Sequence, residues 1–277
     1  MNKSIILFFI VISFGNAQNI ELKFKDFELV KNVKNVVEYE MCGSKNLVIK
    51  SVNQLDELLL QKKLKSRKEL EYSFNQEGYI TEKKKYTNDS IFKKVYKYDA
   101  ENLLLEATET ASPTEIENYS AYAKELYLRI DNEVTKIWTF AKIDTVGYSE
   151  YYKIKNNYIV EEHVAGFNNL RQKIEYDKNY NRLSGLIILA SGQKLTWKNS
   201  YTFYPNGVVK SKLCLWTDTL TKTTETYFPN GLIKTESSKN RALDHTYKYD
   251  QNGNWVYKMT YKNKNLQEIL KREITYF

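Results

Sequence analysis

One short phrase recurs along the chain and constrains the fold more than any single residue does. An aromatic residue, any residue and a second aromatic residue are followed by three further residues and then by a residue suited to a turn. The copies consist of Tyr72, Phe74 and Gly78; Tyr96, Tyr98 and Asn102; Tyr201, Phe203 and Gly207; Tyr247, Tyr249 and Gly253; and, in a partial copy, Tyr227 and Gly231. A unit repeated in this way predicts a repetitive architecture.

Each copy reads as a β-hairpin. Residues i and i+2 of a strand point to the same face, so the two aromatic rings of a copy share a face. Asn-Gly is a strong hairpin signal because both residues tolerate positive φ, and it occurs at Asn206-Gly207 and Asn230-Gly231. An apolar residue such as Trp255 follows two positions after the turn residue. The clear copies cover residues 72–83, 96–107, 201–212, 227–236 and 247–258.

The predicted fold is therefore mainly β: an extended antiparallel array of hairpins, arranged as a meander or an open curved sheet. Stacked hairpins would stabilise one another through shared apolar faces. Two short helices are also expected. One spans residues 53–70, where Leu55, Leu58 and Leu59 form an apolar stripe, and the other spans residues 113–126, which open with a cap-like Ser112-Pro113.

Residues 1–17 have the features of a secretory signal. Lys3 precedes an apolar run over residues 5–12, and Gly15-Asn16-Ala17 supplies small residues for cleavage. The run is too short for a membrane-spanning helix, which takes about 20 residues. We expect export to the periplasm or the extracellular space, and a mature chain, residues 18–277, that forms a single domain without a transmembrane helix.

The charge of the chain allows two interpretations. There are 42 Lys and Arg residues against 34 Asp and Glu residues, a formal net charge of +8. Such a surplus can attract polyanions, but intermixed Lys and Glu on exposed strand faces explain it as well. Export argues against a nucleic acid as the partner, so a protein or glycan of the cell envelope is expected. Cys42 and Cys214 are expected to be buried thiols, with a disulfide between them as the alternative.

The sequence predicts no catalytic, cofactor-binding or metal-binding residue. The two histidines, His163 and His245, lack further His or Cys residues at ligand spacing. Asp250 begins a segment that looks like a calcium loop, but position twelve of that loop is Tyr261 instead of an acid. Asp250 and the similar Asp177 are therefore expected to form Asx turns.

Several segments resemble known repeat families. Tyr98-Asp99, Tyr176-Asp177 and the segment 249–255 resemble the YD repeats of Rhs-type proteins. The Tyr-Pro-Asn-Gly segment 204–207 and the Phe-Pro-Asn-Gly segment 228–231 resemble the MORN-like repeats of YwqK-type proteins. Over residues 29–277 the chain looks like a small exported, Bacteroidetes-type member. The resemblance implies an extracytoplasmic hairpin array without a shared active site.

Three functions are open at this point. The first is an exported, non-enzymatic repeat protein that acts as a binding or scaffold module in the cell envelope. The second is a carrier of an apolar or lipid ligand in a half-barrel. The third is a hydrolase of envelope polymers. The absence of catalytic motifs ranks them in this order.

Overall fold

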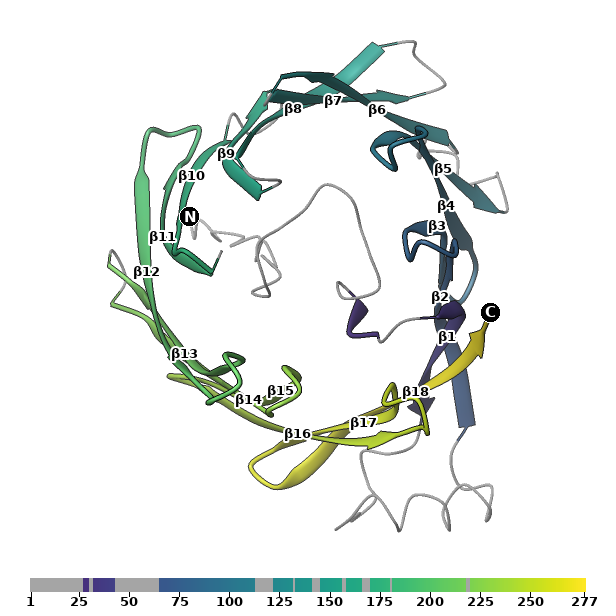
Figure 1. Ribbon diagram of the computed structural model, residues 1–277, viewed down its shortest axis with the longest axis vertical. Helices are drawn as coiled ribbons and strands as arrows, with labels where there is room; N and C mark the ends of the chain where they lie inside the picture. Colours follow the sequence, from purple (N-terminus) through teal and green to yellow (C-terminus); the bar gives the residue numbers. More distant parts are fainter. Residues whose placement is uncertain are drawn as a thin grey trace, which may run out of the picture.

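In a computed structural model, the chain forms a closed antiparallel β-barrel (Figure 1). The structure describes residues 27–29, 32–42, 65–112, 122–131, 133–140, 145–155, 158–165, 170–179, 181–217 and 220–277. The eighteen strands of these residues are β1 (Val33–Cys42), β2 (Lys65–Phe74), β3 (Ile80–Tyr86), β4 (Ile91–Tyr98), β5 (Leu104–Ser112), β6 (Tyr122–Ile130), β7 (Glu133–Phe140), β8 (Thr145–Lys155), β9 (Tyr158–Ala165), β10 (Leu170–Tyr176), β11 (Arg182–Ile188), β12 (Lys194–Phe203), β13 (Val209–Trp216), β14 (Lys222–Tyr227), β15 (Ile233–Ser238), β16 (Arg241–Tyr249), β17 (Trp255–Lys262) and β18 (Asn265–Tyr276).

The seam between β1 and β18 closes the sheet. Each strand pairs with the next along the chain, and β1 pairs with β18 from Val33↔Tyr276 to Glu40↔Leu270. The predicted open hairpin array was therefore wrong. An open sheet leaves unpaired N–H and C=O groups on its first and last strands, and closure removes both edges. Local patterns predict hairpins but do not encode how far a sheet curves.

The two predicted helices were also wrong where the structure describes them. Residues 65–70 belong to β2 and residues 122–126 belong to β6. In β6, Glu125 is buried while Leu128 and Ile130 on the other face are 54% and 74% exposed, which is a period-two pattern. The remainder of both segments, including the apolar stripe of 55–59 and the cap at Pro113, lies outside the described residues.

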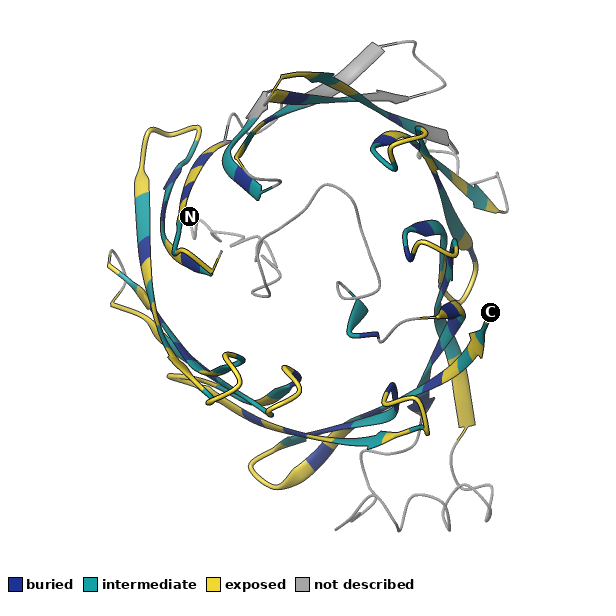
Figure 2. Ribbon diagram, viewed as in Figure 1, coloured by how far each residue is buried: buried dark blue, intermediate teal, exposed yellow. Residues whose placement is uncertain are grey.

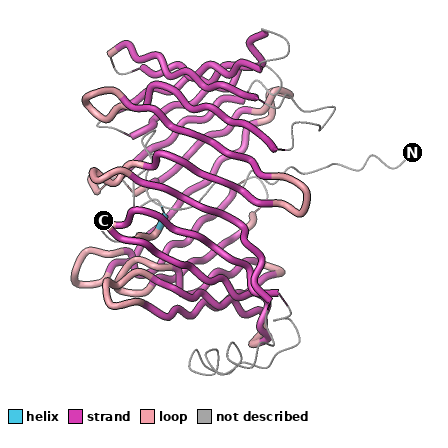
Figure 3. The backbone as a smooth tube through the Cα atoms, turned by 90° about the vertical axis from the view of Figure 1, so that its right-hand side faces the viewer, coloured by secondary structure: helices cyan, strands magenta, loops and turns pink. Residues whose placement is uncertain are grey.

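The repeated phrase is the hairpin that carries one rim of the barrel, which we call the turn rim. In all five copies the residue after the second aromatic makes the same two backbone hydrogen bonds. In one copy the N–H of Tyr204 donates to the oxygen of Val208, and the N–H of Gly207 donates to the oxygen of Tyr204. The same pair recurs at Asn75, Asp99, Phe228 and Asp250. The second aromatic sits at a register shift, as at Thr202/Phe203. Figure 3 shows the strands running obliquely between this rim and the opposite one.

The strands have an inner and an outer wall. Phe27–Leu29, the dark purple segment inside the ring in Figure 1, packs against Tyr72 and Phe74, so the face bearing these two residues is the inner wall. The register then places Glu38, Glu125 and Glu225 on the same wall. The register places most buried side chains on it, and along the strands buried residues alternate with more exposed ones (Figure 2). A barrel of 18 strands is wider than one of eight, which its own side chains fill, so we expect it to enclose a lumen.

Candidate functional site

The inner wall carries a row of buried, paired charges, and it is the candidate functional site. Glu125 on β6 is 1% exposed and accepts bonds from Lys94 on β4 and from the Tyr127 hydroxyl. Lys136 on β7 lies 3.8 Å from Glu125 and 3.0 Å from Glu150 on β8. The row therefore connects four strands, β4, β6, β7 and β8, and crosses β5. Isolated buried charges are unstable, so the pairing is what allows these groups to line the wall.

The same arrangement recurs on the other side of the barrel. Lys212 on β13 lies 3.2 Å from Glu225 on β14, and both residues are buried. The Tyr227 hydroxyl donates to Glu225, as the Tyr127 hydroxyl does to Glu125. Burial and the neighbouring carboxylate raise the pKa of Tyr227, so the phenol stays protonated and remains a donor. A Glu-x-Tyr pair facing inward is thus a repeated element of the wall.

Arg272 spans the closing seam on the inner wall. Its Nε lies 2.7 Å from Oε1 of Glu38 on β1, and its guanidinium stacks 3.6 Å from the ring centroid of Trp255. Guanidinium groups suit such sites because they stack on aromatic rings while donating hydrogen bonds. The predicted repeat residue Trp255 therefore both packs in the core and supports the seam.

The inner wall of β9–β11 holds a carboxyl group with an unusual environment. Glu162 stands directly opposite Gln172, whose buried amide nitrogen Nε2 has no hydrogen-bond partner. Burial, together with the nearby charge of Glu150, raises the pKa of Glu162, and Lys136 and Arg182 only partly offset this. This part of the wall is the one where charge pairing is least complete.

The aromatic repeat residues connect successive hairpins near the turn rim. Their hydroxyl groups donate to backbone oxygens of the neighbouring hairpin: Tyr98 to Ile80 at 2.8 Å, Tyr201 to Arg182 at 2.8 Å and Tyr247 to Ile233 at 2.9 Å. Tyr72, Phe74 and Tyr96 belong to one buried cluster with Leu29 and Ile80. The repeat residues therefore have structural positions in the wall and do not converge on a single site.

The turn residues of the repeat hold backbone conformations that the sequence indicates. Gly78, Gly207, Gly231 and Gly253 have φ between 82° and 89°, and Asn102 has φ 62° in the equivalent place. The Asx turns are confirmed, because Oδ1 of Asp250 accepts from the backbone of Asn252 and Asn254. No group of residues suited to a metal ion occurs in the described part of the chain.

His245 is a buried inner-wall residue with two partners. Nε2 lies 2.9 Å from Glu236, and Nδ1 lies 3.1 Å from the hydroxyl of Thr260. Thr260 itself is 7% exposed, which closes it to a substrate. The arrangement therefore holds β15, β16 and β17 together. Cys214, the other group considered from the sequence, is a buried free thiol, and the side chain of Cys42 lies outside the described residues.

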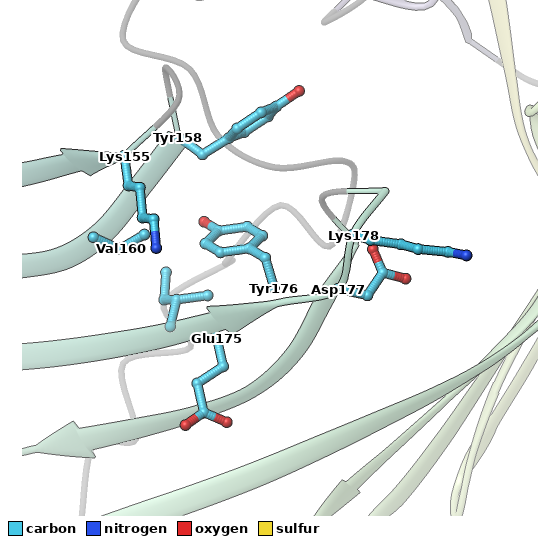
Figure 4. A pocket seen from close by; sticks show the side chains of 8 residues that line it. Lys155, Tyr158, Val160, Glu175, Tyr176, Asp177 and Lys178 are labelled. Carbon is cyan, nitrogen blue, oxygen red and sulfur yellow. The ribbon is translucent and has the colours of Figure 1, made fainter.

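A cavity of about 510 Å³ opens at the turn rim beside β8–β11 (Figure 4). Its aromatic lining is Tyr158 and Tyr176, whose ring centroids are 5.9 Å apart. The Tyr176 hydroxyl donates to the Ile159 oxygen at 2.6 Å. Figure 4 shows Glu175 pointing away from the two rings. The lining includes Ile174 and Tyr176 of the inner wall together with Lys155 and Glu175 of the opposite face, so the cavity lies at the edge of the wall.

The outer wall of β2–β6 carries a chain of exposed and half-buried ion pairs, and the exposed Leu128 and Ile130 lie beside it at the end of β6. Glu71 is 2.7 Å from Lys68 and 3.6 Å from Lys84, and Glu82 is 2.7 Å from Lys84. Glu106 is 2.7 Å from Lys124. The outer faces of β12–β16 present mostly Lys, Thr and Ser, among them Lys198, Ser200, Thr202, Ser211, Thr224, Thr226, Thr235 and Ser237. Exposed apolar residues such as Leu128 and Ile130 on β6 and Leu215 on β13 stand among these polar and charged residues, whereas a lipid-facing barrel wall has a continuous apolar band.

Searches for similar proteins give matches among solved structures alone. A scan against family models and a search of curated proteins find no match for the chain. A porin-like protein from Bacteroides uniformis has 10% identity and a TM-score of 0.48, over 88% of this chain and 97% of that one. A porin-like protein from Bacteroides vulgatus has 10% identity and a TM-score of 0.32, over 90% and 99%.

The family assignment made from the sequence was wrong. The described residues form a closed 18-stranded barrel, whereas the YD-repeat and MORN-like resemblance predicted an open array. At these identities and TM-scores, function has to be argued from the geometry of this chain. The described part of the chain contains no helix with the length and hydropathy of a membrane-crossing segment.

The charged residues of the inner wall were not predicted from the sequence. Lys94, Glu125, Lys212 and Glu225 look like ordinary surface residues of polar strands. A signal was present in the Glu-x-Tyr spacing of Glu125–Tyr127, Glu150–Tyr152 and Glu225–Tyr227, because residues two apart in a strand share a face. Because of that spacing, the carboxylate and the partly buried tyrosine ring lie on the same face of the strand.

Proposed function

We propose that the chain is an exported pore-type barrel: a closed tube whose charged inner wall takes up hydrophilic solutes and lets them pass along its axis. The observation that carries this proposal is the buried, paired charge row on the inner wall of a closed 18-stranded barrel. Barrels of 16 to 18 strands leave an aqueous channel. The signal-like residues 1–17 support export.

This proposal replaces the three functions inferred from the sequence. The binding or scaffold module rested on an open hairpin array, and the sheet is closed. The apolar carrier required a half-barrel with an apolar interior, whereas Glu125, Lys212 and Glu225 are buried on the inner wall. The third function, a hydrolase of envelope polymers, is replaced together with the other two. That the chain is not an enzyme stays a prediction, which the pore-like architecture supports.

Pore-forming barrels have short turns at one rim, and the connections of the turn rim are of this kind. At the turn rim, residues 204–208, 228–232 and 250–254 make tight connections. Both the start of β1 and the end of β18 lie at this rim, because Val33 pairs with Tyr276.

The charged and polar residues of the outer wall support an aqueous location for the arcs β2–β6 and β12–β16. A lysine on the lipid face at mid-bilayer costs roughly 2–4 kcal/mol. Lys84, Lys93 and Lys124 on one arc and Lys198 on the other would add such costs together. We therefore propose that the barrel works in the aqueous space of the envelope, with its axis open to solutes, instead of having its whole wall in lipid.

Accessibility of matched cysteines tests the lumen. Asn199 faces the inner wall and its neighbour Ser200 faces out. In a background with Cys42→Ser and Cys214→Ser, we expect a small sulfonated thiol reagent to modify both Asn199→Cys and Ser200→Cys. A thiol-reactive polyethylene glycol too large to enter should modify Ser200→Cys alone. An Asn199→Cys thiol that resists the small reagent would refute a water-filled lumen.

Vesicle flotation tests the location of the wall. The mature chain, purified without detergent, should stay with the aqueous fraction when mixed with phospholipid vesicles. Flotation with the vesicles together with single-channel conductance would contradict the aqueous placement and identify a membrane pore instead.

A further inference from the structure

The segment that precedes β1 lies inside the barrel and is held there by specific contacts. The Phe27 ring is 4.8 Å from the Tyr72 ring and 5.3 Å from the Phe74 ring, measured between centroids. Leu29 is 8% exposed and belongs to the same inner-wall cluster. Figures 1 and 3 both show this short segment inside the barrel, in the space that the strands enclose.

A polar contact fixes the segment on the other side of the closing seam. The Glu28 carboxylate accepts a hydrogen bond of 2.9 Å from the indole nitrogen of Trp255. Trp255 in turn stacks on Arg272, which pairs with Glu38. Phe27 therefore contacts β2 and Glu28 contacts β17. These two strands lie on opposite sides of the β1–β18 seam.

Two residues of this region hold the backbone at positive φ. Glu28 has φ 57° and Asn32 has φ 70°, both in the left-handed region that non-glycine residues avoid. Such conformations persist where the surroundings stabilise them. After Asn32 the chain joins β1 at the turn rim, where the Asn32 oxygen accepts from the N–H of Phe277.

We propose that Phe27–Leu29 forms an internal plug that narrows the lumen on the turn-rim side and sets the size limit for solutes. This inference rests on the proposed function, since a plug has meaning only in a tube that solutes enter. The plug is attached by the side chains of Phe27, Glu28 and Leu29, which take no part in the strand pairing, so its contacts can be removed without substituting a residue of the strands.

The test compares the size limit of the lumen with and without the plug contacts. The reporter is the Asn199→Cys thiol in the Cys42→Ser, Cys214→Ser background, and the probes are thiol-reactive polyethylene glycols of increasing size. We expect Phe27→Ala combined with Glu28→Ala to raise the largest probe that reacts and to increase the rate for small probes several-fold. Tyr158→Ala is the matched control, because it removes an inner-wall aromatic contact away from the plug.

A second variant keeps the inference testable if the double substitution folds poorly. A mature chain that lacks residues 18–29 should show the enlarged size limit, and an added synthetic peptide of residues 18–32 should restore the original limit. The chemical shift of the Trp255 indole N–H in NMR reports on the contact with Glu28. A change in this chemical shift shows that the hydrogen bond to the Glu28 carboxylate has been lost.

The outcomes separate the two proposals. An unchanged size limit, with the Trp255 signal showing that the segment has been released, overturns the plug and leaves the tube standing. A reporter thiol that resists the smallest probe in every variant overturns the tube, and the plug with it.

Discussion

Lys94 on β4 and Glu125 on β6 are bonded to each other across β5, the strand that lies between them. The residue beneath the bond is Ala107, which pairs with Tyr96 on one side and with Glu125 on the other and is fully buried. A methyl side chain leaves room for the lysine to cross. The inner wall is therefore connected over more than neighbouring strands, and its charges act as a network.

Replacing the centre of this network should be costly. Glu125→Gln keeps the shape but leaves Lys94 and Lys136 without their shared carboxylate. Removing one partner of a buried ion pair costs about 3–5 kcal/mol. We expect a loss of this size in the free energy of unfolding measured by urea denaturation. Glu106→Gln is the control, since the carboxylate of Glu106 pairs with Lys97 and Lys124 on the outer wall, where exposed pairs contribute about 0–1 kcal/mol. Equal effects of the two substitutions would contradict the inward placement of Glu125.

Glu71 should make stability fall in acid. Burial alone would raise its pKa, but hydrogen bonds from Lys68 and Tyr86 and the charges of Lys68 and Lys84 hold the pKa at about 2, below the ordinary 4.5. A depressed carboxyl pKa contributes stability above the unfolded-state pKa, and the contribution is lost as the pH falls through the folded-state value. Glu71→Gln should be less stable than the parent at pH 7, and the difference should shrink between about pH 4.5 and pH 2. Thermal unfolding across this range measures it, and a difference that is independent of pH would refute the assignment.

Glu162 should behave in the opposite way. Its pKa is raised, first by burial and then by Glu150, so the folded chain binds the proton more tightly than the unfolded chain does. The ionised carboxylate thus reduces stability above the unfolded-state pKa. Glu162→Gln is expected to be more stable than the parent at pH 8 and to match it in acid below pH 4.5. Glu161→Gln, which alters the next residue on the outer wall, should change little at either pH. A Glu162→Gln variant that is less stable at pH 8 would show that the carboxylate is favourably paired.

The hairpins were predictable because their signals are local. Asn206-Gly207 and Asn230-Gly231 determine the turns through backbone conformations that only a few residue types adopt at low cost. The same applies to the Asx turn at Asp250, whose short side chain reaches its own backbone. These features depend on residues within about five positions, so the sequence predicts them directly.

The closure of the barrel and the residues of its inner wall were not predictable. The inner wall reverses the usual rule that apolar side chains are buried and charged side chains are exposed. In β6, Leu128 and Ile130 point outward and are exposed, while Glu125 points inward and is buried. A rule that places apolar residues inside and charged residues outside orients this strand the wrong way round. Only the register to β5 and β7, which depends on residues far along the chain, shows which face looks into the barrel.

Asn102 offers a test of the repeated turn. It holds φ 62° where the other clear copies have glycine, and an ordinary residue pays roughly 1–2 kcal/mol in this region, with Asn paying less. Asn102→Gly should therefore stabilise the protein by less than about 1 kcal/mol. Gly207→Ala should destabilise it by about 1–2 kcal/mol through the backbone alone, because a Cβ at Gly207 meets no atom within 4 Å. Chemical denaturation checks both, and a neutral Gly207→Ala would contradict the left-handed turn.

Gly185 and Trp197 test the packing of the inner wall. They face each other on β11 and β12, and a Cβ at Gly185 would lie 2.5 Å from the Trp197 indole ring. Trp197 is 4% exposed, so the ring has little space to move. Gly185→Ala should cost about 1–3 kcal/mol, the usual range for an overpacked site. The added methyl group clashes with the indole ring of Trp197. In a double-mutant cycle, Gly185→Ala should therefore cost much less stability in a Trp197→Leu background than in the parent. Trp197→Leu by itself destabilises the wall. Urea denaturation of the four chains gives the coupling energy. Strictly additive effects would show that Gly185 is required for its backbone and not for the indole that lies over it.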